Sequence, residues 1–445
     1  MTYDALIFTH SITPRLVYVV DFLSQYYGHS FGITSDEVRY RNAIEKVRIN
    51  YSFHRLNPAE IFIHPHALLS ETYIRSVKVE CFEKLSGFAS FKTYKAFFRA
   101  EGDFGFDMLA AIFYLLSRYE EYLPHQADSY GRFDHEESIA WKNDFLHLPL
   151  INIWLEDFRK LLADKDIQFS ISSSQFTFLP TYDIDMAWSF LHKGFKRNAG
   201  GMLLSLLQFR FRSLMYRIRV LRGKISDPFD AYEWMNHLHR SFGLKPIFFF
   251  LVGKARNRYD KNIDVRKPAF QKLVRKIAET DNVGLHPSWS SGDQPGLLVR
   301  EKHSLENIAK KNINTSRQHF IRFEMPVTFR RLIEAGIEYD HSMGYGSING
   351  FRASIATPFL WYDLKKEEKT KLLIHSFCFM DANAYYEQQL DPEEALEEML
   401  RYFKVIRSVN GMMITIWHNS FLGTEEEFKG WRDIYEQFAM MAAAG

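Results

Sequence analysis

Cysteine is scarce in this chain, and neither sign of charge dominates it. Only two of its 445 residues are cysteines, Cys81 and Cys378, and they lie far apart. They form neither a disulfide framework nor a metal motif, so we expect a protein of a reducing compartment, the cytoplasm. The 56 Lys and Arg residues almost balance the 54 Asp and Glu residues. This balance gives no reason to expect a nucleic acid as a partner.

Long hydrophobic runs are missing as well. No window of about 18 uncharged apolar residues occurs, which argues against a membrane-spanning helix. Asp4, with no basic residue before the first apolar stretch, makes the N-terminus unlike a secretory signal. Apolar residues nevertheless make up 46% of the chain and charged residues 25%, as in soluble globular proteins. At this length we expect two or three domains with a sizeable core.

Residues 1–168 form the first predicted unit, an α/β or α+β domain. Short apolar runs predict strands at 5–9, 47–53 and 60–63, and helical spacing predicts helices at 16–27, 106–122 and 149–162. Asp103 is the predicted N-cap of the second helix, and the polar residues 163–166 are the predicted linker. This unit holds no recognisable catalytic constellation.

From 169 to 445 the sequence alternates between predicted strands and helices. The strands are predicted at 176–182, 247–252, 282–285, 372–379 and 412–417. The helices are predicted at 231–242, 269–280, 304–311, 326–335 and 392–408. Such alternation favours a parallel sheet or a β/α barrel, in which the chemistry belongs just past the carboxyl ends of the strands.

Acidic and histidine side chains follow four of these strands. Asp183 and Asp185 follow the first strand, His286 the third, Asp381 the fourth and His418 the last. A carboxylate and a histidine can hold Zn²⁺, so we predict metal-assisted hydrolysis with Asp185 and His286 as ligands. Asp183 then serves as the general base and His418 as the general acid. The alternative is that Asp183 or Asp185 only caps the next helix.

Five short motifs occur in the order found in one known family. They are Thr181-Tyr182-Asp183-Ile184-Asp185, Leu285-His286-Pro287-Ser288, Arg317-Gln318-His319-Phe320, Tyr339-Asp340-His341-Ser342 and Ile414-Thr415-Ile416-Trp417-His418. Over roughly 170–445 the chain resembles the NodB-homology polysaccharide deacetylases. The resemblance implies a deformed (β/α) barrel that hydrolyses amide or ester bonds of acetylated sugars with a divalent metal, zinc being the expected one. It also implies that Arg317 orients the base.

The N-terminal unit carries a resemblance of its own. The segments 115–122 and 130–133 resemble the domain that precedes the deacetylase module in Bacteroidetes-type proteins. That domain has no known function, so the resemblance leaves the task of residues 1–168 open.

The second motif departs from the family pattern. The family has histidines four residues apart, and here Ser290 stands where the second one is expected. A catalytic zinc usually has three protein ligands, of which Asp185 and His286 supply two. We hypothesise that His319 completes the site. The alternatives are a surface role for His319, with metal bound weakly or not at all, and a catalytically degenerate, saccharide-binding protein.

Four further residues are predicted to contact the substrate. Arg352 can pair with a phosphate, a uronate or the catalytic aspartate, and Asp381 can bind sugar hydroxyls. Trp289 and Trp417 lie next to proposed site residues and can stack on a sugar face. Structural ion pairs and core packing are the alternatives for these residues. A glycoside hydrolase that uses Asp183 and Asp381 is a further alternative function.

A basic insertion interrupts the predicted barrel at about 195–225. Residues 193–224 contain nine Lys or Arg and no acidic residue. Within it, apolar residues recur at spacings of three and four, which predicts one amphipathic helical face over 200–222. Such a helix can lie peripherally on the inner membrane face and suits a lipid-linked saccharide. The alternative is a helix docked on the barrel with a solvated basic face.

Overall fold

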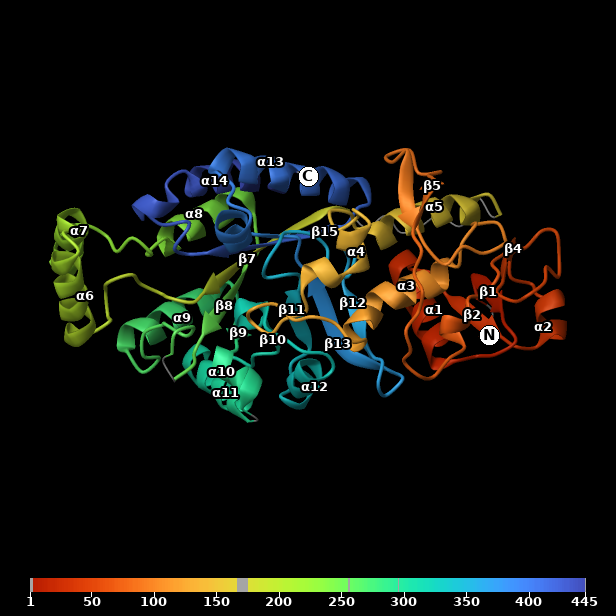
Figure 1. The fold of residues 1–445 in the computed structure, drawn as a ribbon, viewed down its shortest axis with the longest axis horizontal. Coiled ribbons are helices and arrows are strands. Elements are labelled where there is room, and N and C mark those ends of the chain that lie inside the picture. Colours follow the sequence, from red (N-terminus) through yellow and green to blue (C-terminus); the bar gives the residue numbers. More distant parts are fainter. Residues whose placement is uncertain (1–2, 166–174, 255–256, 295, 445) are drawn as a thin grey trace.

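The structure of the protein, a computed structural model, describes residues 3–165, 175–254, 257–294 and 296–444. Its long axis runs from a small N-terminal unit, through a large central sheet, to a helical hairpin at the opposite end (Figure 1). The predicted linker at 163–166 coincides with the end of a helix, and Asp166 lies outside the described residues.

The N-terminal unit contains a small parallel sheet. Its strands are β1 (Ala5–Phe8), β2 (Phe31–Thr34), β3 (Val47–Asn50) and β4 (Ile61–Phe62), in the order β2-β1-β3-β4. Helix α1 (Pro14–Tyr27) begins where the Thr13 side chain caps its first turn, and Gly28 in a left-handed conformation ends it. The unit also contains α2 (Glu37–Arg41) and the antiparallel pair β5 (Phe82–Leu85) and β6 (Thr93–Ala96).

Helix α3 (Met108–Leu116) is shorter than the helix predicted at 106–122. All of its residues are buried, so its sequence has no polar face. Asp107 is its N-cap, and the predicted cap, Asp103, lies in the preceding loop. Arg118 adopts a left-handed conformation that ends the helical run. A 3₁₀ turn (Tyr119–Tyr122), α4 (Ile139–Lys142) and α5 (Leu150–Ala163) follow.

A nine-stranded sheet forms the centre of the molecule, in the order β12-β13-β11-β10-β9-β8-β7-β15-β14. The strands are β7 (Thr177–Ile184), β8 (Ile247–Leu251), β9 (Asn282–His286), β10 (Thr315–Ser316), β11 (Tyr339–Met343), β12 (Phe359–Asp363), β13 (Glu368–Ser376), β14 (Phe379–Met380) and β15 (Met412–His418). All neighbours are parallel except β12 and β13, so the predicted parallel sheet is confirmed. The sheet curls like part of a barrel, and in the described pairings it stays open between β12 and β14.

Helices flank this sheet on two sides. In the view of Figure 1, α8 (Tyr232–Phe242), α13 (Pro392–Ser408) and α14 (Trp431–Ala443) lie above the central strands. Below them lie α9 (Pro268–Thr280), α10 (Trp289–Asp293), α11 (Leu297–Ala309) and α12 (Val327–Glu334). Helix α11 begins earlier than the helix predicted at 304–311. Strands β10, β11 and β12 lie where the sequence predicted none.

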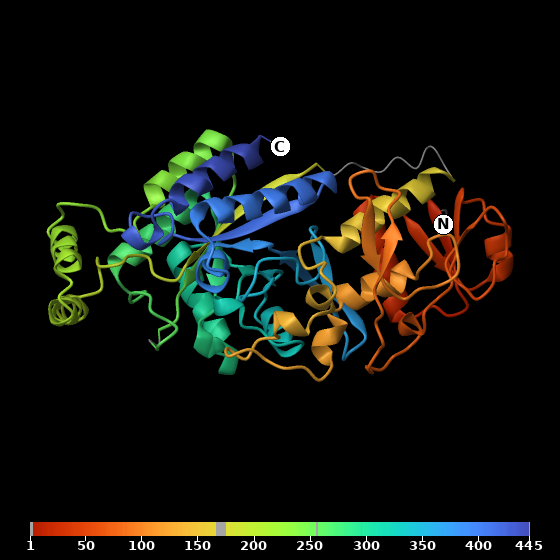
Figure 2. The same ribbon diagram turned by 45° about the horizontal axis from the view of Figure 1, so that its top comes forward.

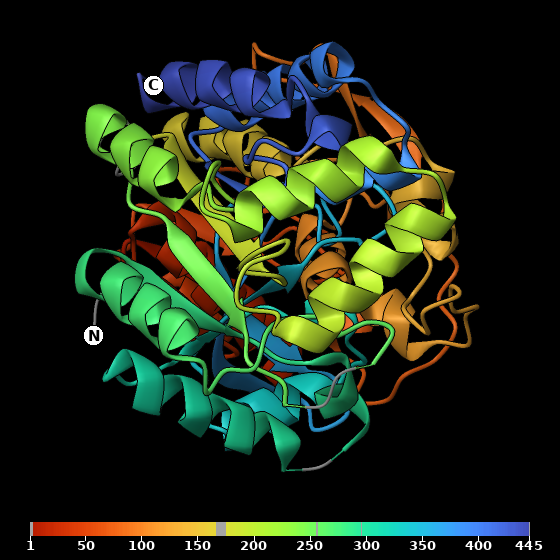
Figure 3. The same ribbon diagram turned by 90° about the vertical axis from the view of Figure 1, so that its left-hand side faces the viewer.

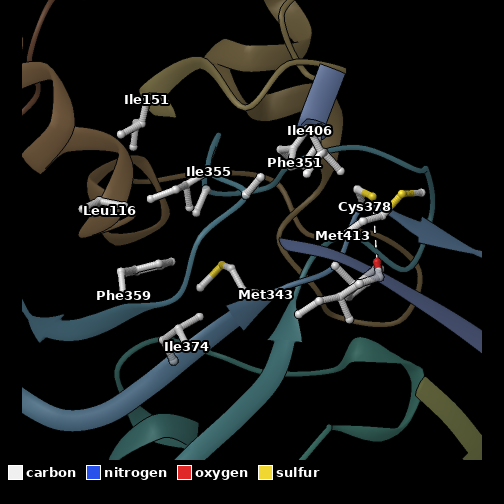
Figure 4. Packing of buried hydrophobic residues seen from close by; sticks show 14 of the residues in the cluster. Leu116, Ile151, Met343, Phe351, Ile355, Phe359, Ile374, Cys378, Ile406 and Met413 are labelled. Atoms are coloured by element: carbon white, nitrogen blue, oxygen red, sulfur yellow. Dashed lines mark hydrogen bonds between the residues drawn. The ribbon is translucent and has the colours of Figure 1, made fainter. Parts of the chain in front are cut away.

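The N-terminal unit and the central sheet share one hydrophobic core. Figure 4 shows Leu116 and Ile151 from the N-terminal unit beside Ile355, Phe359 and Ile374 from the β12–β13 region. Polar contacts join the same surfaces, including the Tyr18 hydroxyl, which donates to the carbonyl of Leu360 (2.7 Å). Loops of the N-terminal unit therefore have a fixed place relative to the sheet.

The basic insertion forms two helices rather than the single amphipathic helix predicted over 200–222. They are α6 (Phe195–Leu207) and α7 (Phe211–Leu221), joined by a turn in which Phe209 has a left-handed conformation. The hairpin stands out from the body in Figure 2 and faces the viewer in Figure 3. Among the helices of the described residues, none is long and apolar enough to cross a membrane.

Candidate metal centre

The strand-end residues predicted from the sequence meet in one cleft of ≈ 470 Å³. The cleft is lined by Asp183, Asp185, His286, His319 and His418, together with residues of the surrounding loops. These residues come from, or directly follow, strands β7, β9, β10 and β15, which lie close together in the sheet. Parallel strands present their carboxyl ends at the same edge, and this is why distant segments of the sequence converge here.

A buried arginine fixes the carboxylate of Asp183. Arg317 Nη1 donates to Asp183 Oδ1 (2.8 Å). The remaining donors of Arg317 reach Thr181 Oγ1 (2.7 Å) and the carbonyl of His341 (3.0 Å). Asp183 Oδ2 is left 3.7 Å from His286 Nε2, within the cleft. The arginine thus orients the carboxylate through a charge-assisted hydrogen bond.

Asp185, His286 and His319 bring their ligand atoms within 4.8 Å of one another. Asp185 Oδ1 lies 3.1 Å from His286 Nε2, and Asp185 Oδ2 lies 3.3 Å from His319 Nε2. Asp185 Oδ1 is nevertheless buried without a hydrogen bond to any described residue. Two imidazole nitrogens and a carboxylate are a common zinc ligand set, so this trio fits a divalent cation.

Both histidines of this trio are held through their other ring nitrogen. His286 Nδ1 contacts the carbonyl oxygen of Arg317 (2.6 Å), and His319 Nδ1 contacts Asp260 Oδ1 (3.0 Å). A carbonyl accepts only, so His286 Nδ1 donates, and an ionised Asp260 imposes the same role on His319. The Nε2 atoms are thereby directed to the metal position, as is usual around metal-binding histidines.

Asp260 is a site residue that the sequence did not predict. It lies in the loop after β8 and is 2% exposed. Its Oδ1 also accepts from the backbone amide of Trp289 (2.9 Å), which fixes the carboxylate beside His319. Its position after a strand at the carboxyl edge is the one sequence signal that points to it.

Ser290 lies outside the ligand cluster. It sits in α10, and its Oγ is 3.2 Å from Asn257 Nδ2. His319, from the loop after β10, is the residue that joins Asp185 and His286 in the candidate cluster, and residue 290 is not part of it.

The charges of the site depend on one another. Burial opposes ionisation of Asp185, yet His319 and His286 hold the pKa of its carboxyl well below the ordinary value. Burial likewise opposes protonation of His319, but Asp185 and Asp260 raise its pKa to about 9. In the metal-free protein at neutral pH, His319 therefore carries a proton that a metal must displace.

His418, at the end of β15, is held by Asp381. The two oxygens of Asp381 accept from the backbone amide (2.6 Å) and from Nδ1 (2.7 Å) of His418. Burial lowers the pKa of His418, but the carboxylates of Asp381 and Asp185 outweigh it and raise the pKa to about 10. His418 Nε2 lies 3.6 Å from Asp185 Oδ2, so a protonated imidazole faces the cleft at neutral pH.

Three of the four residues predicted to contact the substrate have side chains engaged in the interior, as the alternative of ion pairs and core packing expects. Arg352 is 1% exposed and binds both carboxylate oxygens of Glu121 (2.8 and 2.7 Å). Trp417 is fully buried against Tyr435, with ring centroids 4.6 Å apart. Asp381 is equally buried, and both of its oxygens accept hydrogen bonds from His418, so it is placed to orient that histidine.

Trp289 supports an aromatic wall of the cleft. Its ring stacks on Tyr259 at a centroid distance of 3.8 Å, and Tyr259 lines the cleft. Phe320 and Tyr130 extend the wall, stacked 5.5 Å apart. Tyr130 belongs to the N-terminal unit, which the sequence had not linked to the site.

A family model matches the N-terminal part of the chain. Residues 5–167 match a family of unknown function (DUF7033). A search of curated proteins finds no match to the chain. The solved structures similar to this chain align with about three fifths of it.

Three of these structures have sequence identities of 13% or less. A protein from Mycobacterium smegmatis named as a polysaccharide deacetylase is 13% identical, with a TM-score of 0.40 over 61% of this chain and 85% of that one. Puue allantoinase is 9% identical, with a TM-score of 0.41 over 62% and 86%. A probable polysaccharide deacetylase from Pseudomonas aeruginosa PAO1 is 11% identical, with a TM-score of 0.39 over 61% and 85%.

Proposed function

We propose that this protein is a metal-dependent hydrolase that removes acetyl groups from a saccharide in the cytoplasm. The observation that carries the proposal is the convergence of a metal-ligand trio, an oriented carboxylate and a charged imidazole in one cleft. The order of the five sequence motifs supports the acetyl group as the one removed.

Five residues of the cleft, together with Arg317 and Asp381, have roles in this chemistry. A divalent cation held by Asp185, His286 and His319 supplies the Lewis acidity that polarises an acetyl carbonyl and acidifies water. Asp183, turned to the cleft by Arg317, accepts the proton of the attacking water. His418 donates its Nε2 proton to the leaving nitrogen or oxygen. The carboxylate of Asp381 stabilises the charged imidazole until that proton is transferred.

A saccharide suits the walls of the cleft. Tyr259 and Phe320 line the cleft, and aromatic side chains are suited to contact the apolar face of a sugar ring. Arg258 and Lys261 are exposed cations on the same cleft. They suit a phosphate-bearing, lipid-linked saccharide, because guanidinium and ammonium groups bind phosphate through charge-assisted hydrogen bonds.

The test is acetate release from N- and O-acetylated oligosaccharides by the zinc-loaded protein. Asp183→Asn should lower the rate by roughly 10²–10⁴ at unchanged metal content, because it removes the base and leaves the ligand trio intact. The matched control is Asp293→Asn, which removes a carboxylate paired with Arg322 outside the cleft. Full acetate release by Asp183→Asn would refute the assignment of the base.

Two other functions predict different outcomes. Saccharide binding without turnover by the zinc-loaded protein would support the degenerate, saccharide-binding alternative. A glycoside hydrolase would release new reducing ends, but Asp381 is a poor second carboxylate for it, because both of its oxygens bind His418.

We also propose that the α6–α7 hairpin attaches the protein to an anionic membrane surface. Seven large apolar side chains around the hairpin tip are between 49% and 80% exposed: Leu203, Leu204, Leu206, Leu207, Phe209, Phe211 and Met215. Of the nine basic residues of 193–224, seven flank this tip and two, Arg210 and Arg212, lie within it, and the segment has no acidic residue. An apolar tip between basic residues matches the interface of an anionic bilayer better than it matches water.

The dimensions of the hairpin favour a peripheral position. Helices of 13 and 11 residues are about 20 and 17 Å long, shorter than the roughly 30 Å hydrocarbon core. The base of the hairpin contacts residues around the cleft: Arg197 Nη2 donates to the carbonyl of Lys261 (3.1 Å). Tyr216 contacts Thr424 (3.3 Å between hydroxyl oxygens), three residues beyond the cleft residue Phe421. A docked hairpin therefore holds the cleft close to lipid-linked substrates.

Vesicle flotation tests the attachment. The wild type should float with phosphatidylglycerol-containing vesicles and much less with pure phosphatidylcholine. The triple change Leu207→Ser, Phe209→Ser, Phe211→Ser should abolish flotation. The matched control, Val38→Ser, Ile44→Ser, Leu85→Ser, changes equally exposed apolar residues of the N-terminal unit and should float like the wild type. Flotation of the tip variant equal to that of the wild type would contradict membrane attachment. A wild-type dimer that the tip changes disrupt would contradict it as well, because the tip would then be an interface between two copies.

A further inference from the structure

A loop of the N-terminal unit reaches the metal centre. Residues 127–133 form a tight turn closed by a bridge between Ala127 and Phe133. Asp128 braces it from inside: its Oδ1 accepts from the amides of Tyr130 and Arg132 (both 2.9 Å), and its Oδ2 accepts from Arg132 Nε (2.6 Å). The turn therefore presents the Arg132 guanidinium in a fixed direction.

Arg132 binds the backbone next to the proposed ligand His319. Its Nη1 donates to the carbonyl of Phe320 (2.8 Å), and the side chain is almost completely buried. Phe320 and Ile321 both have left-handed conformations, with φ of 59° and 54°. Two consecutive non-glycine residues of this kind persist only where the surroundings hold them, and a left-handed pair beside a ligand points to a functional constraint.

The loop after β11 leaves room for this contact. Gly346, in the loop after β11, lies so close to the guanidinium that a Cβ atom there would be 1.9 Å from Arg132 Nη1 and 3.0 Å from the carbonyl oxygen of Phe320. Tyr130 stacks on the Phe320 ring at 5.5 Å and completes the enclosure of the turn. The contact of Arg132 with the turn is therefore built from three separate segments.

We infer that Arg132 is a positioning residue for the metal centre, through which the N-terminal unit holds His319 in ligand geometry. Asp260 fixes the imidazole of His319 from the side, and Arg132 fixes the backbone that carries it. This explains how a ligand on an irregular loop can replace the helical position of Ser290. The inference rests on the metal centre proposed above, and it gives the N-terminal unit a part in the site.

Metal affinity of the full chain tests the inference without any turnover assay. Zn²⁺ titration and the visible spectrum of the Co²⁺-loaded protein report the ligand set. Arg132→Ala should weaken metal binding by about 10–100-fold and change the Co²⁺ spectrum, the usual size of effect for a partner behind a ligand. Gly346→Ala, which displaces the guanidinium, should do the same. Arg55→Ala, which removes an ion pair with Asp103 elsewhere in the N-terminal unit, is the matched control.

A double-mutant cycle separates positioning from general loss of stability. If Arg132 acts through His319, then Arg132→Ala should weaken metal binding little further in a His319→Ala background. Additive losses would overturn the inference, as would a folded Arg132→Ala protein with wild-type affinity and spectrum. A wild type that binds metal but releases no acetate would refute the proposed function alone. A wild type that binds no metal would overturn both.

Discussion

Removal of the Asp381 charge should change the pH dependence of the reaction in a specific direction. Asp381 is the main electrostatic reason why the pKa of His418 is about 10 and not the ordinary 6.5. This difference corresponds to roughly 5 kcal/mol in favour of the charged imidazole, at about 1.4 kcal/mol per pKa unit. Asp381→Asn keeps the shape and removes the charge, so the pKa of His418 should fall by about 1–3.

The sign of the effect follows from the role of His418. A general acid must be protonated, so activity is lost as the pH rises through its pKa. In Asp381→Asn the alkaline limb of the kcat profile should therefore move down by about 1–3 pH units. The rate at pH 6 should change little, whereas the rate near pH 9 should fall by about 2-fold for a pKa shift of about 1 and by about 100-fold for a shift of about 3.

Two assays measure this shift independently. Acetate release between pH 5 and 11 gives the alkaline limb, and NMR titration gives the pKa of the His418 ring, assigned with His418→Gln. Asp363→Asn is the matched control, because Asp363 is also a buried aspartate but binds Arg330 away from the cleft. An unchanged alkaline limb in Asp381→Asn, with His418 titrating as in the wild type, would refute the acid role.

Further predictions concern the pH dependence of metal binding and the stability of the fold. Zn²⁺ affinity should fall about tenfold per pH unit below pH 9, because the metal displaces the proton of His319, whose pKa is about 9; a pH-independent affinity between pH 6 and 8 would contradict this. The same raised pKa should stabilise the metal-free protein fully below pH 6.5, with the contribution lost as the pH rises through about 9, as measured by urea unfolding. Arg352→Ala should lower the free energy of unfolding by about 1.5–3 kcal/mol, since Glu121 loses one of its two buried arginine partners and keeps Arg118, while zinc content stays unchanged.

The sequence predicted the parallel sheet and much of the site because one rule links them. Asp183, His286 and His418 were found by their place after strands, and the structure brings all three to the same edge. The rule depends only on strand direction. An uninterrupted apolar run such as that of β8 is typical of a buried strand in a parallel sheet. The same rule placed Asp381 correctly at this edge. It could not distinguish a residue that contacts the substrate from one that binds His418.

What the sequence missed depends on contacts between distant segments. Asp260 and Arg132 reach His319 from a long loop and from the other unit, and no local pattern distinguishes them from surface charges. Strand β10 has only two residues, too few for a periodic signal. Arg352 follows a site motif and Trp417 precedes His418 within one, but alternation along a strand or loop turns such neighbours to the core.

The zinc stoichiometry of the purified protein tests the central claim most directly. We expect one tightly bound zinc per chain in the wild type and in His303→Ala, which changes an exposed histidine of α11. His286→Ala and His319→Ala should each lose tight binding, because each leaves only two protein ligands. Equal, tight zinc in His319→Ala and the wild type would contradict the ligand trio on which the proposed hydrolase depends.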